Sequence, residues 1–109
     1  MAAFMLRRVA TFVFRLKAPR PNFAVDMTDE EREIMGRHAA HWQPLIESGH
    51  MVFFGPVLDQ GGSWGLGIVE AEDEEKIHAL AAADPAVTSG TAQIELGKML
   101  AGHVRPRSA

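Results

Sequence analysis

The chain has 109 residues, a net charge of −3 and ordinary shares of hydrophobic (47%) and charged (23%) residues, values typical of one globular domain. The acidic balance argues against nucleic-acid binding, which favours a basic face, and the absence of cysteine excludes disulfides, thiolate nucleophiles and cysteine-based metal sites. Uncharged runs near the N-terminus, such as Val9 to Phe14, are too short for a signal peptide or a membrane span, so we expect a cytoplasmic protein without membrane contact.

The first predicted strand covers residues 9–17, which are dominated by β-branched and aromatic side chains. Both faces of this strand are largely apolar at its centre, so we expect both faces to be covered. Residues 18–27 contain two prolines and an asparagine, and they are expected to form a loop.

A long helix is predicted between Thr28 and Gly49. Thr28 and Glu31 have the spacing of a capping box, in which hydroxyl and carboxylate each accept from a backbone N–H. Gly49 is a typical C-terminal stop, and Pro44 predicts a kink or a weak last turn because it removes one helical hydrogen bond. Residues at spacings of three and four mark the buried face, namely Ile34, Met35, His38, Trp42, Leu45 and Ile46.

Two further strands are predicted to pair as a hairpin. His50 to Phe54 forms the second strand, which we expect Gly55-Pro56 to end, and Trp64 to Ala71 forms the third strand after a glycine-rich turn. Two glycines of the third strand, Gly65 and Gly67, share one face and leave it thin. Another group is therefore expected to approach the backbone closely there.

A second helix is predicted to begin after Asp73 and to end at Asp84-Pro85, because a residue before proline is pushed away from helical geometry. Residues 86–90 are expected to be an irregular connection, and Thr91 to Leu100 the last strand. The order β-α-β-β-α-β predicts a ferredoxin-like α+β fold, in which one antiparallel sheet carries two helices on one face.

One domain is expected to span residues 1–109, with a core over about residues 9–100 and loose tails. The sheet face without helices carries apolar residues that this order of elements leaves uncovered. Because monomers rarely expose so large an apolar patch, we expect a homodimer that closes over this face.

Four features, in this order, resemble the YCII-related (YciI-like) proteins, small domains of the dimeric α+β barrel group. They are His38 eleven positions before Gly49, Gly55-Pro56 after the second strand, Glu70-Ala71 before the acidic helix start at 73–75, and Ala83-Asp84-Pro85 followed by Gly90. The resemblance implies that His38 and Asp84 form an active-site dyad. The family more often has an aromatic residue where this chain has Ala86, which predicts a roomier pocket.

A histidine suits the role of general base, because its imidazole can take up and return a proton near neutral pH. Asp84 would fix the tautomer of His38 and support its charged form, as carboxylates do in other His–Asp pairs. The structural alternative is a buried histidine bonded to backbone, with Asp84 only capping the turn before the last strand.

Ser89, Gly55, Pro56 and Trp42 are further candidates for binding a substrate. Ser89 follows Asp84 closely in sequence, Gly55 and Pro56 would shape a pocket wall, and Trp42 would line an aromatic pocket. Each also has a structural alternative. Ser89 would be a turn residue, Gly55 and Pro56 would end the strand, and Trp42 would pack in the core.

We expect neither a metal nor a cofactor. His38, His41 and His50 raise the question of a metal site, but the His-Glu-x-x-His pattern and a nearby acidic ligand are missing. The glycine pairs at residues 61–62 and 65–67 lack the strand–turn–helix context of a phosphate-binding loop.

Three functions are compatible with these observations. The first is a cofactor-independent enzyme that carries out lyase or isomerase chemistry on a small organic molecule, aromatic or acidic, with His38 and Asp84 moving the proton. A few relatives of the family resemble enzymes that remove chloride from hydroxylated aromatic rings. The alternatives are a non-catalytic dimeric module that binds a small ligand or a partner, and a cofactor-free monooxygenase.

Overall fold

The computed structural model of the chain describes residues 9–106, so the predicted tails lie partly outside the described residues. Its elements are β1 (Ala10–Lys17), α1 (Phe23–Asp26), α2 (Asp29–Ser48), β2 (Met51–Asp59), β3 (Gly62–Ala71), α3 (Glu74–Ala82), α4 (Pro85–Thr88) and β4 (Gln93–Lys98). None of the helices within residues 9–106 is both long and apolar enough to cross a bilayer.

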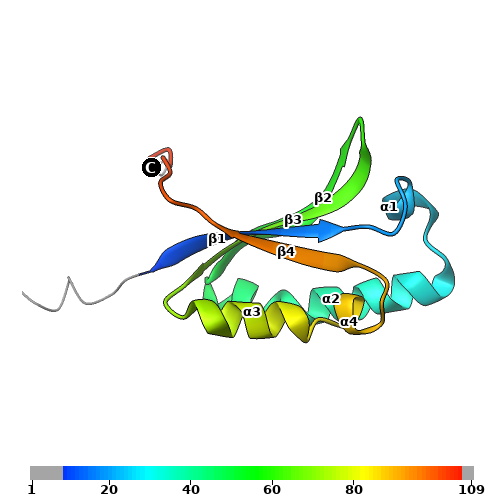
Figure 1. Ribbon diagram of the computed structural model, residues 1–109, viewed down its shortest axis with the longest axis horizontal. Helices are drawn as coiled ribbons and strands as arrows, with labels where there is room; N and C mark the ends of the chain where they lie inside the picture. Colours follow the sequence, from blue (N-terminus) through cyan, green and yellow to red (C-terminus); the bar gives the residue numbers. More distant parts are fainter. Residues whose placement is uncertain (1–8, 107–109) are drawn as a thin grey trace, which may run out of the picture.

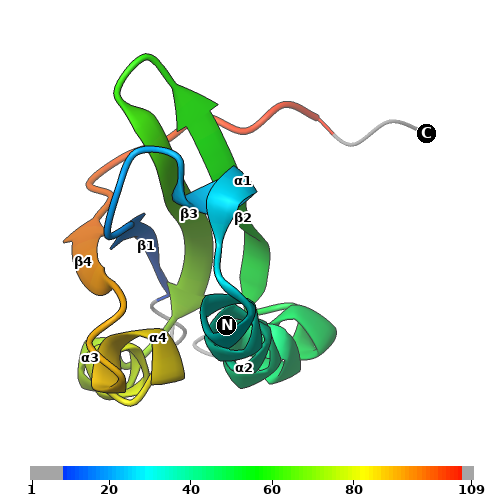
Figure 2. The same ribbon diagram turned by 90° about the vertical axis from the view of Figure 1, so that its right-hand side faces the viewer.

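The four strands form one antiparallel sheet in the order β2-β3-β1-β4. The helices α2, α3 and α4 lie along one face of this sheet, and α1 lies at one end of it (Figure 1). Seen from that end, α2 runs beside α3 and α4 (Figure 2). This arrangement confirms the predicted ferredoxin-like α+β fold.

The core lies between the sheet and the helices. Alternate residues of β1 point into it, because successive side chains of a strand face opposite sides. Phe12, Phe14 and Leu16 are at most 3% exposed. The residues that pack with them come from every other long element, and include Trp42 of α2, Met51 of β2, Val69 of β3 and Ile77 of α3.

The close approach expected at the glycine face of β3 is confirmed, and the groups that approach it are side chains of the core. A Cβ placed on Gly67 would lie 2.9 Å from Met51 Cε and 3.1 Å from Phe14 Cγ. A Cβ on Gly65 would lie 3.0 Å from Leu16 Cβ. The two glycines therefore let large side chains of β1 and β2 lie against the β3 backbone.

The start and end of α2 are as predicted. The Thr28 hydroxyl accepts from the Glu31 N–H, and the Glu31 carboxylate accepts from the Thr28 N–H, which completes the capping box. Gly49 follows the helix with φ of 84°, a left-handed conformation that glycine adopts without strain. The helix continues through Pro44 to Ser48, so the lost hydrogen bond does not end it.

The predicted end of the second strand at Gly55-Pro56 is wrong, because β2 continues to Asp59. Pro56 pairs with Gly65 inside the strand. Since β2 lies at the edge of the sheet, a proline is tolerated there, as the outward N–H positions of an edge strand need no partner.

Two short helices occupy segments for which irregular backbone is predicted. α1 lies within the expected loop of residues 18–27, and α4 begins at Pro85 and covers the first part of the expected connection of residues 86–90. α3 ends at Ala82 with Ala83 as its C-cap, and Asp84 caps α4, with Pro85 in the first turn, where its missing N–H is harmless.

Within residues 9–106 no helix lies over the second face of β1 (Figure 1), in line with the expectation that this chain alone leaves the face uncovered. Val13 on this face is half-buried, whereas Val9 is 49% exposed. The register aligns Val13 with Ile68 of β3, and Ile68 with Phe53 of β2, in one row across three strands. We call the side of the sheet that carries this row the open face.

Replacement of Gly67 by Ala is expected to destabilise the fold, because the new methyl group would crowd Phe14 and Met51 in the core. The cost is on the order of 1–2 kcal/mol in the free energy of unfolding, as for other overpacked cores. Urea denaturation would measure it. Gly97→Ala in β4 is the matched control, since nothing lies within 4 Å of its Cβ position. Equal stability of the two variants would contradict this description of the β3 face.

Candidate functional site

His38 and Asp84 are brought into direct contact although 46 positions separate them in the sequence. The distance from His38 Nδ1 to Asp84 Oδ2 is 2.6 Å. The Asp84 side chain is fully buried, and His38 is 7% exposed. The contact joins the middle of α2 to the turn between α3 and α4, which is how two distant segments form one site.

Asp84 is held by three hydrogen bonds. Its Oδ1 accepts from the Ala86 N–H at 2.8 Å, the bond that caps α4. Its Oδ2 accepts from His38 and also from the indole Nε1–H of Trp42 at 2.7 Å. Trp42 lies one helical turn after His38, so both donors come from the same face of α2.

The protonation state of Asp84 follows from these partners. Burial alone would raise the pKa of the Asp84 carboxyl, but hydrogen bonds from His38, Trp42 and the Ala86 N–H outweigh burial and hold the pKa below its usual value. Asp84 is therefore ionised at neutral pH, and an ionised carboxylate can only accept hydrogen bonds.

The tautomer of His38 follows in turn. Because Asp84 can only accept, His38 Nδ1 must carry a hydrogen, and in the neutral ring Nε2 is left with a free lone pair. Every buried side-chain nitrogen and oxygen among the described residues has a hydrogen-bond partner, yet Nε2 makes no hydrogen bond. This nitrogen is therefore reached by solvent.

The space that His38 lines is a cavity of about 340 Å³ on the helix side of the sheet. Its side chains are almost entirely apolar. They come from β1, α1, α2, β2 and the link between the two helices, and include Phe14, Leu16, Phe23, Met27, Met35 and Phe54. The imidazole is tilted against Phe14 and meets Phe54 edge to face, with ring centroids 6.1 and 5.8 Å away. These contacts hold the ring in the cavity wall.

The segment that contains α1 contributes Phe23, Ala24 and Met27 to the cavity wall. Arg20 fastens this segment to α2, because its guanidinium donates to both oxygens of Glu31 at 2.7 and 2.8 Å and to Asp26 at 2.9 Å. The bond from Arg20 is the main cause that lowers the pKa of Glu31 to about 2. Phe23, which Arg20 overlies, is 3% exposed and forms part of the cavity wall.

The other predicted substrate-binding residues divide into two groups. Gly55 and Pro56 line the cavity with His38. Trp42 and Ser89 do not line it. Trp42 donates to Asp84 from a fully buried position, and the Ser89 hydroxyl bonds to Ala86 O and Thr91 Oγ1.

The histidines considered as metal ligands lie in different surroundings. His41 Nε2 donates to the Leu80 carbonyl oxygen at 2.8 Å, and His50 bonds to Ser48. Within residues 9–106, no group of three or more His, Asp or Glu side chains could hold a metal ion.

Several residues of the site carry no functional signal in the sequence. The pattern of residues 18–27 predicts only a loop, yet Phe23 and Met27 line the cavity. For Trp42 the sequence does hold a signal. Its spacing of four from His38 places both side chains on one face of the helix, which is compatible with their donating to the same acceptor.

Comparisons with known proteins agree with this architecture. No curated protein sequence matches the chain. Among the solved structures that match is the 5-chloro-2-hydroxyhydroquinone dehydrochlorinase of Burkholderia phenoliruptrix AC1100, in complex with 2,5-dihydroxybenzoquinone. The TM-score is 0.64 at 21% sequence identity, and the match covers 84% of this chain and 95% of the other. At this identity the likeness supports the fold alone.

The family assignment comes from the sequence itself. The profile of the YCII-related domain matches residues 11–99, which include every strand from β1 to β4 except the first residue of β1. The match agrees with the resemblance seen in the order of motifs and with the observed fold. The chain belongs to the YCII-related domain family.

Proposed function

We propose that the protein is an enzyme that moves a proton on a small organic molecule with His38 as general base and Asp84 as its partner. The observation that carries this proposal is the short bond between the two side chains beside an apolar cavity. The bond leaves Nε2 as a basic nitrogen without a hydrogen-bond partner, on a side chain that lines the cavity. An apolar pocket with a few convergent polar groups is a typical small-molecule site.

The proposed step begins with His38 Nε2 taking a proton from a C–H or O–H group of the substrate. The resulting imidazolium is stabilised by the ionised Asp84. The electron pair left behind either moves within the substrate or expels a leaving group. In the first case His38 returns the proton to another atom and an isomer forms. In the second the substrate loses a proton and an anion, which is a lyase reaction.

A dehalogenating lyase is the specific form that we favour. The dehydrochlorinase that shares the fold was solved with a hydroxylated ring compound, 2,5-dihydroxybenzoquinone. An aromatic or quinone ring also suits the lining of Phe14, Phe23 and Phe54. Neither reaction requires a redox carrier, so we propose cofactor-independent chemistry.

The second candidate is a non-catalytic module that binds a small ligand in the same cavity. It is favoured by one feature, namely that His38 is the only ionisable side chain among the described residues of the lining. Such a protein would bind ring compounds without converting them.

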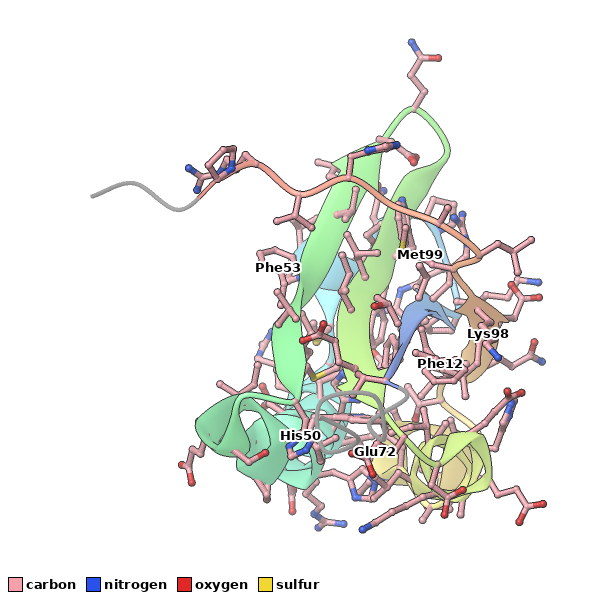
Figure 3. The ribbon with its side chains drawn as sticks, turned by 90° about the vertical axis from the view of Figure 1, so that its left-hand side faces the viewer. Phe12, His50, Phe53, Glu72, Lys98 and Met99 are labelled. Atoms are coloured by element: carbon pink, nitrogen blue, oxygen red, sulfur yellow. The ribbon has the colours of Figure 1, made fainter. Side chains whose placement is uncertain are left out.

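We also propose a homodimer that forms through the open face. Phe53 is 53% exposed at one end of the apolar row that continues through Ile68 to Val13 (Figure 3). Met99, 41% exposed, extends β4 by a backbone bond to Thr11. Burial of these side chains against a second copy would remove them from water, which stabilises the pair by the hydrophobic effect.

His38→Ala is expected to reduce turnover at least about 100-fold, because it removes the proposed base. The measurement is chloride release and absorbance change with chlorinated dihydroxy- and trihydroxybenzenes. Far-UV circular dichroism should show that the variant is folded. His78→Ala, at an exposed histidine on α3, is the control and should keep wild-type activity. Turnover that survives the loss of His38 would contradict the role of this residue.

Trp42→Phe is expected to raise the pKa of Asp84, since it deletes one of three bonds that hold the carboxylate. A lowered pKa stabilises the fold above the ordinary carboxyl pKa, and this contribution is lost as pH falls through the folded value. Acid unfolding of the variant should therefore begin at higher pH. Carboxyl carbon NMR would follow Asp84 directly.

The matched control for this experiment is Trp64→Phe, which removes an indole that donates to Asp59 instead. It should leave the titration of Asp84 unchanged. If both variants, or neither, shift the pKa of Asp84, Trp42 does not hold the carboxylate in the way that the geometry indicates.

Phe53→Asp is expected to dissociate the proposed dimer, because it places a charge in the apolar row of the open face. Sedimentation velocity at micromolar concentration would report the change in mass. Val25→Asp, at a residue on α1 that is 75% exposed, is the control and should remain dimeric. A monomeric wild-type protein would contradict the dimer but leave the cavity proposal intact.

A further inference from the structure

Among residues 9–106, few polar side chains line the cavity, and only one of them keeps an unused polar atom. Ser63 lines the cavity, but its hydroxyl donates to the Pro21 carbonyl oxygen at 2.9 Å and accepts from the Ala24 N–H at 3.1 Å. Trp64 also lines the cavity, but alternation along β3 places its indole on the open face, where Nε1–H donates to Asp59 at 2.8 Å. Of the described side chains in the lining, His38 alone keeps an unused polar atom, Nε2.

Three cations that lie near lining residues in the sequence, Arg15, Lys17 and Arg20, are engaged by other groups. The guanidinium of Arg20 is bound by Asp26 and both carboxylate oxygens of Glu31. Arg15 and Lys17 belong to β1, but alternation along the strand places both on the open face, opposite Phe14 and Leu16. There Arg15 stacks over Trp64, and Lys17 approaches Glu95.

An anionic ligand would therefore lack a partner. A carboxylate or phosphate that enters an apolar cavity loses its hydration, and this cost is large unless a cation compensates it. A protonated His38 does not supply that cation freely, because its positive charge is already matched by Asp84 at 2.6 Å. Neutral His38 offers only a lone pair, which repels an anion and accepts from a hydrogen-bond donor.

The size of the cavity sets the scale of the ligand. An apolar cavity of roughly 150 Å³ is enough to hold benzene. The cavity beside His38, at about 340 Å³, has room for one ring with substituents.

We infer that this cavity selects uncharged ring compounds that present one acidic O–H or N–H hydrogen to His38 Nε2, and that it rejects carboxylates and phosphates of equal size. The inference deepens the proposed function by naming its substrate class, and it rests on that function for the identity of the binding site. It predicts that the cavity discriminates between uncharged and anionic ligands. A preference for rings alone would not predict this.

The test compares three ligands of one shape: toluene, 4-methylphenol and 4-methylbenzoate. At pH 7 the phenol is uncharged and can donate, the toluene cannot donate, and the benzoate is anionic. Affinities would be measured by amide NMR titration of the full chain, following the Gly55 and Gly65 signals in the cavity wall. We expect 4-methylphenol to bind at least about fivefold tighter than toluene, the usual worth of one hydrogen bond, and tighter still than 4-methylbenzoate.

Two variants make the result specific to His38. His38→Ala should abolish the advantage of 4-methylphenol over toluene, whereas His78→Ala should preserve it. Equal or tighter binding of 4-methylbenzoate overturns the inference, as does an absence of binding by all three ligands or an advantage of the phenol that survives His38→Ala.

Failure of this inference and failure of the proposed function are distinguishable. The expected order of affinities without turnover of any bound phenol would leave the charge selectivity standing and contradict the catalytic role. Turnover of an anionic ring compound that is lost in His38→Ala would support the catalytic role and overturn the charge selectivity.

Discussion

The Oδ2 atom of Asp84 accepts hydrogen bonds from two side chains of one helix. The arrangement of the site depends on this pair of hydrogen bonds. His38 and Trp42 lie one turn apart on α2, and their donors reach the same oxygen at 2.6 and 2.7 Å. The other oxygen caps α4. A single buried carboxylate thus connects the long helix to the turn that leads into β4, and a buried charge is tolerable only with such complete pairing.

The same bonds explain why the imidazole is directed as it is. The ionised Asp84 forces the hydrogen of neutral His38 onto Nδ1, so that the lone pair of Nε2 faces away from the carboxylate. Phe14 and Phe54 hold the ring on the sheet side. Phe14 can lie there because Gly67 of β3 has no Cβ to oppose it. The packing of the core therefore also determines the position of the His38 ring.

Local motifs were the part of the fold that the sequence predicted best. The capping box at Thr28 and the left-handed Gly49 need only neighbouring residues, and both occur as expected. Gly55-Pro56 misled because its effect depends on position in the sheet: these residues would interrupt a central strand, but β2 is an edge strand. The segment of α1 is tied to α2 by the contact of Arg20 with Glu31, which local propensity does not contain. The short helix α4 rests instead on the local Asp84 cap and Pro85 in its first turn.

The site itself was predictable only in part. The pairing of His38 with Asp84 came from the resemblance to a family, since no pattern in the sequence shows that residues 46 apart meet. The cavity wall depends on the approach of α1 to β3 and on the path of β2, which are tertiary features. The composition of that wall became accessible only from the structure.

The most direct test of the central claim is the tautomer of His38, measured by long-range ¹H–¹⁵N NMR at a pH where the imidazole is neutral. The account predicts a hydrogen on Nδ1 and a bare Nε2 whose ¹⁵N shift changes when a phenol binds. A hydrogen on Nε2, or an Nε2 signal that no ligand perturbs, would contradict it.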